Sequence, residues 1–324
     1  VSRTWNTIVL DEAHTIKNRD TKMSQSAMKL KADFRLLLTG TPLQNHVSEM
    51  WNLMQFANPD LLGTFQEFTT RFLLPIERDH DKERQRLLKR IITPFILRRT
   101  KSEVLNELPA KTEITLKVDL TSDEWAFYDN IRQKALAEIE EKSATAMQAL
   151  AEITRLRQAA CNVRLVEPTL HLASSKLDLF MQIVDELHAN HHRALVFSQF
   201  TSHLALVRER LDSEGVSYLY LDGSTSAKER IRLVEEYQQG DVSLFLISLK
   251  AGGLGLNLTA ADYVVHLDPW WNPAIEEQAS DRAYRIGQHK PVTVYRLISA
   301  GTIEEKIIEL HQTKKNMADA LLEG

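Results

Sequence analysis

Two adjacent carboxylates, Asp11 and Glu12, begin an Asp-Glu-Ala-His sequence that could bind a metal ion and activate water. Residues 7–10, just before them, are β-branched or apolar and predict a buried strand that ends at the acids. At such a strand end one acid can hold Mg²⁺ through water, while its neighbour polarises the water that attacks a γ-phosphate. A four-residue motif occurs often by chance, so an ordinary pair of acids between a strand and a loop stays open as an alternative to a metal site. A metalloprotease is excluded because no His-Glu-x-x-His sequence is present.

A Thr-Gly-Thr-Pro sequence at residues 39–42 follows a second apolar run. The run, residues 34–38, predicts another strand, and the glycine and proline predict a sharp turn after it. Together the two strands predict part of a parallel sheet, and the pair of motifs is much rarer by chance than either alone. Two strands are too few for a stable sheet, so we expect this region to be incomplete at its amino-terminal side.

Three glycines, Gly252, Gly253 and Gly255, follow a predicted strand in the second half of the chain. Glycine lets the backbone approach a ligand closely. The spacing does not fit a dinucleotide fingerprint, because a Gly-x-Gly-x-x-Gly sequence that begins at Gly253 would need glycine in place of Leu258. This mismatch disfavours a nicotinamide-dependent dehydrogenase.

A helix is predicted after Asn272, a good N-cap residue that is followed by proline. In that helix Gln278, Arg282 and Arg285 have the spacing i, i+4 and i+7 and would share one stripe. Two arginines and a glutamine held together suit a triphosphate. A surface salt bridge, for instance between Asp281 and Arg285, is an equally good interpretation of the stripe. The neighbouring stripe is apolar and is expected to face the core: Ile275, Ala279, Ala283 and Ile286.

The elements that would position these motifs follow from alternating apolar runs and helical segments. Strands are predicted at residues 193–197, 218–221, 244–247, 263–267 and 292–297, with one more near residues 116–120. Strands that alternate with helices are typical of a doubly wound parallel sheet. Residues 44–170 are expected to be mostly helical, because residues 122–164 contain no glycine or proline and are rich in helix formers.

Composition sets broad limits on the function. The chain has 324 residues, enough for two domains, and its formal net charge of −4 gives no argument for nucleic-acid binding. A nucleic-acid surface would have to be a local patch. One cysteine, Cys161, excludes an intrachain disulfide and fits a reducing compartment. No apolar run is long enough to cross a bilayer, and the amino terminus does not resemble a signal peptide, so we expect the cytosol or nucleus and no membrane.

Eight blocks, taken in order, resemble the motifs of the Swi/Snf-type family of ATP-dependent DNA translocases, in the second helicase superfamily. They are residues 11–14, 38–45, 97–101, 196–200, 221–225, 252–258, 268–273 and 281–288. The last two, Asp-Pro-Trp-Trp-Asn-Pro and Asp-Arg-Ala-Tyr-Arg-Ile-Gly-Gln, are the most characteristic of this family, and they are less similar to the related RNA helicases. The resemblance extends from about residue 8 to about residue 308.

This resemblance implies an α/β fold of two RecA-like lobes, each a parallel sheet with helices on both faces, plus helical protrusions. Residues 1–45 would be the carboxyl-terminal part of an incomplete lobe one, and residues 46–100 its helical protrusion. Residues 101–172 would be the linker and protrusion of lobe two, and residues 173–324 a complete lobe two. ATP with Mg²⁺ would bind between the lobes, and duplex DNA would lie across both.

The resemblance also assigns roles to single residues. Asp11 would hold Mg²⁺ through water, Glu12 would be the general base, and Arg282 and Arg285 would be arginine fingers. Contacts with the nucleotide are implied for Gln278, Gly253, Gly255 and His14, and coupling of its site to DNA for Thr39 and Thr41. Contacts with the DNA track are implied for Ser198, Gln199, Thr225, Lys250 and Trp270.

A DNA-dependent ATPase of this kind would translocate along double-stranded DNA and remodel DNA-bound protein complexes, usually without separating the strands. It would be cytoplasmic and associated with the nucleoid in a bacterium, or nuclear in a eukaryote. Two other functions stay open: a non-catalytic nucleic-acid-binding or regulatory fragment, and an RNA-directed motor of the same superfamily. The oligomeric state, the host and the remodelled target stay open too.

The sequence departs from the family at one point, since it contains no Gly-x-x-x-x-Gly-Lys-[Ser/Thr] loop. That loop cradles the phosphates with backbone N–H groups and a lysine. An arginine finger contributes about 10³–10⁵ in rate, but only when the phosphates are already positioned. We therefore expect the chain alone to hydrolyse ATP negligibly.

Overall fold

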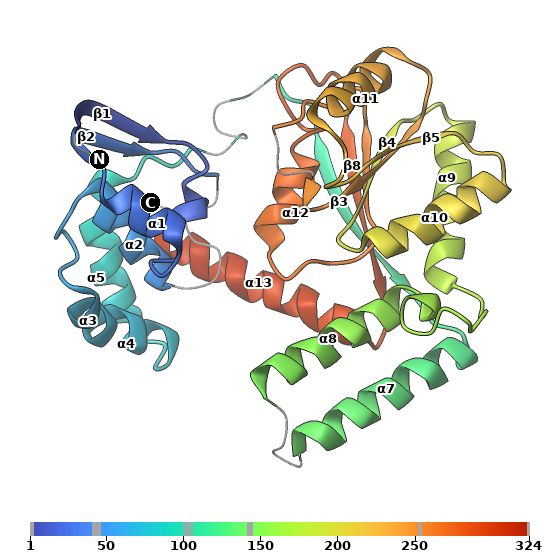
Figure 1. Ribbon diagram of the computed structural model, residues 1–324, viewed down its shortest axis with the longest axis horizontal. Helices are drawn as coiled ribbons and strands as arrows, with labels where there is room; N and C mark the ends of the chain where they lie inside the picture. Colours follow the sequence, from blue (N-terminus) through green and yellow to red (C-terminus); the bar gives the residue numbers. More distant parts are fainter. Residues whose placement is uncertain are drawn as a thin grey trace. The chain divides into compact units, whose positions relative to one another are not determined.

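The computed structural model describes residues 3–40, 47–99, 101, 105, 107–140, 145–251 and 255–322. Its contacts divide the chain into two compact units (Figure 1). Unit 1 consists of Val1–Val104 with His311–Gly324, and unit 2 of Leu105–Leu310. Each unit contains a parallel sheet, as the sequence predicts. No helix within the described ranges is long and apolar enough to cross a bilayer.

Unit 1 begins with two strands, where the two apolar runs predict them. β1 (Thr4–Leu10) pairs in parallel with β2 (Lys31–Leu37). The connection between them contains the 3-10 helix η1 (Ala13–Ile16) and the helix α1 (Lys22–Met28). Parallel strands need such a crossover, and it places the carboxyl ends of both strands at the same sheet edge.

The prediction of a buried first strand is wrong, because only one face of β1 and β2 is covered by described residues. Successive side chains of a strand point to opposite faces. One face packs towards η1 and α2 (Val47–Ala57). Its core consists of Ala13, Ile16, Ala27, Leu53 and Phe56. On the opposite face Val9 is 50% exposed and Phe34 is 59% exposed.

Residues 47–99 are mostly helical, as predicted. After α2 the helical elements are α3 (Phe65–Phe68), the π-helix η2 (Thr69–Leu73), α4 (Leu74–Glu77), α5 (Lys82–Ile92) and the 3-10 turn η3 (Thr93–Phe95). They surround a core of Val47, Met50, Met54, Leu62, Phe68, Phe72, Ile76, Leu88 and Ile92. Asp81 begins α5, because its side chain accepts hydrogen bonds from the backbone N–H groups of Glu83 and Arg84.

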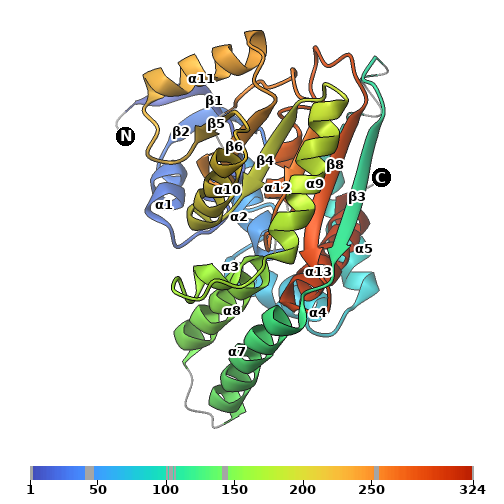
Figure 2. The ribbon, with the colours of Figure 1, turned by 90° about the vertical axis from the view of Figure 1, so that its right-hand side faces the viewer.

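Unit 2 is built on a six-stranded, all-parallel sheet (Figure 2). In spatial order the strands are β3 (Lys111–Val118), β8 (Val292–Ser299), β7 (Tyr263–His266), β4 (Ala194–Ser198), β6 (Leu244–Ser248) and β5 (Tyr218–Leu221). The five strands predicted in the second half are present within a residue or two of their expected ends. The alternating segment near residue 116 joins the same sheet as its edge strand β3.

Helices cover both faces of this sheet. α9 (Ser175–Ala189) and α10 (Thr201–Ser213) pack on one face, and α11 (Ala227–Gln239) and α12 (Pro273–Ser280) pack on the other. Alternate residues of β4 point into the two cores, and every residue of this strand is buried. This is the doubly wound α/β architecture that the alternating strands and helices predict.

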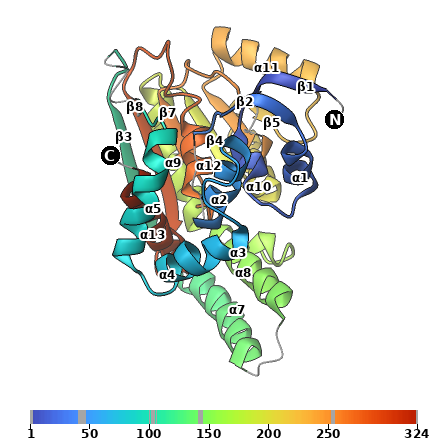
Figure 3. The same cartoon turned by 90° about the vertical axis from the view of Figure 1, so that its left-hand side faces the viewer.

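A helical hairpin is inserted between β3 and α9. α7 (Ser122–Glu140) and α8 (Ala146–Cys161) lie side by side and extend away from the sheet (Figure 2 and Figure 3). The hairpin core contains Tyr128, Ile131, Ala135, Leu156, Ala159 and Ala160. The short turn η4 (Val163–Leu165) follows α8, and α13 (Ile303–Leu322) follows β8.

A buried ion pair joins α9 to the start of α13. Lys176 Nζ lies 2.6 Å from Glu304 Oε2, and both side chains are 1% exposed. Burial alone would lower the pKa of Lys176, but Glu304 holds it above its usual value, so the ammonium stays charged. We expect Lys176→Met to lower the free energy of unfolding by about 3–5 kcal/mol, because Glu304 would remain buried without its counter-ion. Urea denaturation of the chain measures this difference.

The matched control is Lys117, whose ammonium lies 2.8 Å from Glu305 but is 65% exposed. Water solvates both partners of that pair, so Lys117→Met is expected to change the urea midpoint little. Equal losses in the two variants would show that burial does not set the strength of the Lys176 pair.

Candidate functional site

The acid motif lies directly after β1. Asp11 Oδ1 accepts a hydrogen bond from Glu12 N at 2.8 Å. Glu12 has a φ of 49°, in the left-handed region that residues other than glycine rarely adopt. His14 Nδ1 lies 3.2 Å from Glu12 Oε2, and the Glu12 side chain is 48% exposed. The accessible carboxylate therefore follows β1 in an unusual backbone conformation, with His14 beside it.

The Thr-Gly-Thr-Pro segment begins beside the acid motif. Leu38 N donates a hydrogen bond to Leu10 O at 2.8 Å, and Ala13 N donates one to Leu38 O at 3.0 Å. These bonds hold the beginnings of both motifs together at one edge of the unit 1 sheet. Thr39 follows and is half-buried, whereas Thr41 lies outside the described residues.

The predicted stripe of Gln278, Arg282 and Arg285 does not lie on one helix, because α12 ends at Ser280. Gln278 is half-buried on α12. Arg282 is 4% exposed, whereas Arg285 is exposed in the turn that follows. Ile286 is 72% exposed, so its predicted place in the core is wrong, whereas the other three members of the apolar stripe pack there.

The side chain of Gln288 holds the turn that follows α12. Its Nε2 lies 3.1, 2.7 and 3.0 Å from the carbonyl oxygens of Thr259, Ala261 and Ala283. Its Oε1 accepts hydrogen bonds from the backbone N–H groups of the next two residues, each at 2.9 Å. The side chain is 4% exposed, so these bonds form away from water. They fix the turn that presents Arg285.

The glycine-rich loop ends against the same turn. Gly255 has a φ of 60°, which glycine adopts without strain. Leu258 N then donates a hydrogen bond to Arg282 O at 3.0 Å. The end of the loop and the first arginine are therefore neighbours, whereas Gly253 lies outside the described residues.

The residues expected near DNA lie where four parallel strands end. Gln199 and Thr225 come after β4 and β5, and Lys250 and Trp270 come after β6 and β7. Since β4 to β7 run in the same direction, these residues are found on the side of the carboxyl ends of the sheet. Lys250 is exposed, and the other three are half-buried.

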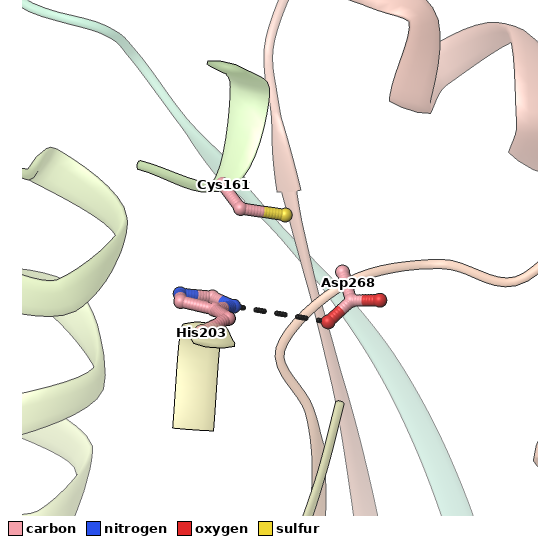
Figure 4. A group of neighbouring side chains, drawn as sticks. All are labelled: Cys161, His203 and Asp268. Carbon is pink, nitrogen blue, oxygen red and sulfur yellow. Dashed lines mark ion pairs between the residues drawn. The ribbon is translucent and has the colours of Figure 1, made fainter. Parts of the chain in front are cut away.

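Ser198, the last residue of β4, is different because it is 1% exposed. Its hydroxyl donates to Asp268 Oδ1, and Gln199 N donates to Asp268 Oδ2 at 3.2 Å. His203 Nδ1 lies 3.8 Å from Asp268 Oδ1 (Figure 4). Burial alone would raise the pKa of Asp268, but His203 and Ser198 hold it below its usual value. In this conformation Ser198 acts inside the fold, by joining the loop after β4 to the loop after β7.

The same region brings together three side chains of the kind that bind metals. Ligand-type atoms of Cys161, His203 and Asp268 lie within 4.8 Å of one another (Figure 4). Both oxygens of Asp268 already accept hydrogen bonds, and Cys161 Sγ lies 3.6 Å from Glu304 Oε1. Burial raises the pKa of the Cys161 thiol well above its usual value, which disfavours the thiolate that a metal requires. We interpret the group as part of the hydrogen-bonded interior.

Glu276 holds the tryptophan loop from the first turn of α12. Its Oε1 accepts a hydrogen bond from Trp270 N, and its Oε2 accepts one from Arg296 Nε, both at 2.7 Å. The side chain is 0% exposed, and burial raises its pKa despite the contact with Arg296. No contact between Glu276 and Trp270 was predicted from the sequence.

His266, at the end of β7, should make stability depend on pH. Burial, with Arg296 nearby, lowers its pKa to about 3 from 6.5. Below about pH 6.5 the unfolded chain would bind a proton at His266, whereas the folded chain would bind it only near pH 3. The free energy of unfolding should therefore fall as the pH falls from about 6.5 towards 3. Between pH 7.5 and pH 5 we expect this residue to account for a loss of about 2 kcal/mol in the free energy of unfolding.

His266→Gln tests this, because glutamine keeps a donor for Ser280 Oγ, which lies 2.9 Å from His266 Nε2, and does not titrate. Urea denaturation at the two pH values should show a smaller pH effect in this variant. The exposed His289, changed to glutamine, serves as the control and should keep the wild-type pH effect. An unchanged pH effect in His266→Gln would contradict the assignment.

Two parallel sheets with motif residues after their strands define a RecA-like α/β protein. In comparisons with protein families, the SNF2-related domain matches residues 1–165, and the helicase conserved C-terminal domain matches residues 175–287. The chain belongs to the SNF2 family, which is the Swi/Snf-type family that its motifs resemble.

Relatives come from bacteria and eukaryotes. YwqA of Bacillus subtilis, named as an ATP-dependent helicase/translocase, is 40% identical over 100% of this chain and 36% of its own length. The ISWI chromatin-remodeling complex ATPase CHR11 of Arabidopsis thaliana is 36% identical over 98% of this chain and 31% of its own length. The chain therefore spans about a third of the length of the curated relatives that it matches.

Among solved structures, the SWI2/SNF2 ATPase core of Sulfolobus solfataricus in complex with dsDNA is 35% identical. The match covers 98% of this chain and 68% of that one, with a TM-score of 0.58. The C-terminal part of the Fun30 ATPase domain, at 23% identity and a TM-score of 0.53 over 66% of this chain, shares the fold.

Proposed function

We propose that the chain is part of an ATP-dependent motor that translocates along double-stranded DNA and remodels DNA-bound protein complexes, in the nucleoid or the nucleus. The observation that carries this proposal is the set of loops after β4, β5, β6 and β7, which places Gln199, Thr225, Lys250 and Trp270 on one side of the unit 2 sheet. The Sulfolobus solfataricus relative was solved with dsDNA, which supports the same partner here.

The residues present fit ATP and Mg²⁺. Asp11 and Glu12 offer accessible carboxylate oxygens, which Mg²⁺ prefers, and Arg285 offers an exposed guanidinium for a phosphate. Bound Mg²⁺·ATP would supply the phosphoanhydride bond whose hydrolysis drives movement. Asp11 would hold the metal through water, and Glu12, with His14 beside it, would accept the proton of the attacking water.

The arginine turn would complete the nucleotide site. Arg285 and Arg282 would stabilise negative charge on the γ-phosphate, and Gln278 with the loop at Gly255 would contact the nucleotide. Thr39, held beside the acid motif, would relay its state towards DNA. Because the sequence contains no phosphate-binding loop of the Gly-Lys type, we also propose that the 324-residue chain alone hydrolyses ATP negligibly.

The test is ATP turnover by the polypeptide of the natural source that contains this sequence, measured without nucleic acid, with duplex DNA and with duplex RNA. The proposal requires stimulation by duplex DNA and little by RNA. Stimulation by RNA instead would favour an RNA-directed motor. A folded protein that binds DNA but shows no turnover would favour the non-catalytic binding module.

A further inference from the structure

Helix α8 carries a buried arginine to which the sequence analysis assigns no role. Arg157 is 3% exposed. Its Nη1 donates a hydrogen bond to Gln199 Oε1 at 3.0 Å, and its Nη2 donates one to Pro269 O at 2.7 Å. One guanidinium therefore bonds to the loop after β4 and to the loop after β7.

Three aromatic rings surround the same guanidinium. Its Cζ lies 5.2 Å from the ring centres of Trp270 and Trp271 and 5.4 Å from that of Phe200. A cation within about 6 Å of an aromatic ring is attracted to it, and more strongly when water is excluded. Arg157 thus contacts the aromatic residues of both loops, in addition to its two hydrogen bonds.

The charge of Arg157 is compensated locally. Burial lowers its pKa, whereas Asp268 acts in the opposite direction, and an arginine stays protonated under these conditions. Asp268 itself bonds Ser198 and Gln199 N. The carboxylate of Asp268 therefore joins the loops after β4 and β7 through hydrogen bonds, and the guanidinium of Arg157 joins the same two loops from α8. The arrangement of the loops depends on all of these bonds together.

These loops carry Gln199 and Trp270, two of the residues that are proposed to contact DNA. Arg157 belongs to a different element, the hairpin of α7 and α8, so a shift of α8 would move both loops together. We propose that Arg157 is a positioning residue that sets the two loops for duplex DNA and couples the helical hairpin to DNA binding. The inference rests on the proposed function, since it assumes that duplex DNA lies along these loops.

The test is Arg157→Lys in the natural polypeptide. Lysine keeps the positive charge near the rings but lacks the planar fork that reaches two acceptors at once. Losing a hydrogen bond made by a charged group changes an equilibrium by about 10-fold or more, so we expect the duplex DNA concentration for half-maximal ATPase stimulation to rise by about this factor. Turnover at saturating DNA should fall less than this. Arg155→Lys, an exposed position on the same helix, should match the wild type.

Amide hydrogen exchange separates this inference from the proposed function. If Arg157 positions the loops, Arg157→Lys should speed exchange at residues 199–200 and at residues 268, 270 and 271, with no change in β6. If exchange is faster in Arg157→Lys but the wild type shows no stimulation of ATP turnover by DNA, both the proposed function and the coupling to DNA are contradicted. Only the contact of Arg157 with the two loops would then stand. Wild-type exchange and wild-type DNA dependence in Arg157→Lys would overturn the inference, as would equal losses at all DNA concentrations.

Discussion

Arg285→Ala is expected to lower DNA-stimulated ATP turnover of the natural polypeptide by about 10³–10⁵-fold. Arg285 is exposed in the turn fixed by Gln288, so its guanidinium is free of the core and can reach a ligand outside unit 2. In phosphoryl transfer such an arginine stabilises charge that develops in the transition state. Steady-state turnover at saturating duplex DNA and ATP measures the loss.

A control arginine is available in the same unit. Arg210 lies near the end of α10 and pairs with Glu214 on the surface, so Arg210→Ala should leave turnover unchanged. Folding of both variants is checked by urea denaturation. Turnover of Arg285→Ala within about tenfold of the wild type would remove the arginine from the catalytic account, since an arginine finger contributes far more.

Glu12→Gln is the second large effect, with turnover expected to fall by about 10²–10⁴-fold. The amide keeps the size and polarity of the side chain but cannot accept the proton of the attacking water. Binding of ATP and of duplex DNA should persist, because Asp11 and the unit 2 loops are unchanged. Single-turnover hydrolysis and equilibrium DNA binding, measured on one preparation, separate these two effects.

The control for this variant is Asp33→Asn, which removes an exposed carboxylate early in β2, away from the strand end that carries the motif. It should keep wild-type turnover. If Glu12→Gln lost nucleotide or DNA binding together with turnover, Glu12 would be holding the site together and the general-base role would be contradicted.

Much of the fold follows from local patterns in the sequence. Largely apolar runs such as residues 193–197 predict buried strands because parallel sheets are covered on both faces, and both faces of β4 are covered here. The same rule fails for β1, because what covers a strand depends on other elements. Val9 looks as buried in the sequence as Val196 but is 50% exposed.

The candidate site was predicted less well, for a physical reason. The helix that carries Gln278 ends at Ser280, and the contacts of Gln288 with Thr259 and Ala261 fix the turn beyond it. Helical periodicity cannot anticipate a side chain that bonds carbonyl groups 27 and 29 residues earlier in the chain. The predicted stripe of Gln278, Arg282 and Arg285 therefore extended beyond the end of the helix.

Arg157 was missed for the same reason. Its hydrogen-bond partners Gln199 and Pro269 are 42 and 112 residues away in the sequence. Within its own helix it is only a cation among helix-forming residues. The one available signal was its place, one residue after Leu156 and four before Cys161, on the side of α8 that is buried.

The most direct test of the central claim is displacement of a third strand from a DNA triplex by the natural polypeptide. A motor that moves along duplex DNA should release the third strand when ATP is present, leave the underlying duplex paired, and lose this activity in Glu12→Gln. ATP turnover stimulated by DNA without release of the third strand, or release that is independent of ATP, would contradict translocation along duplex DNA.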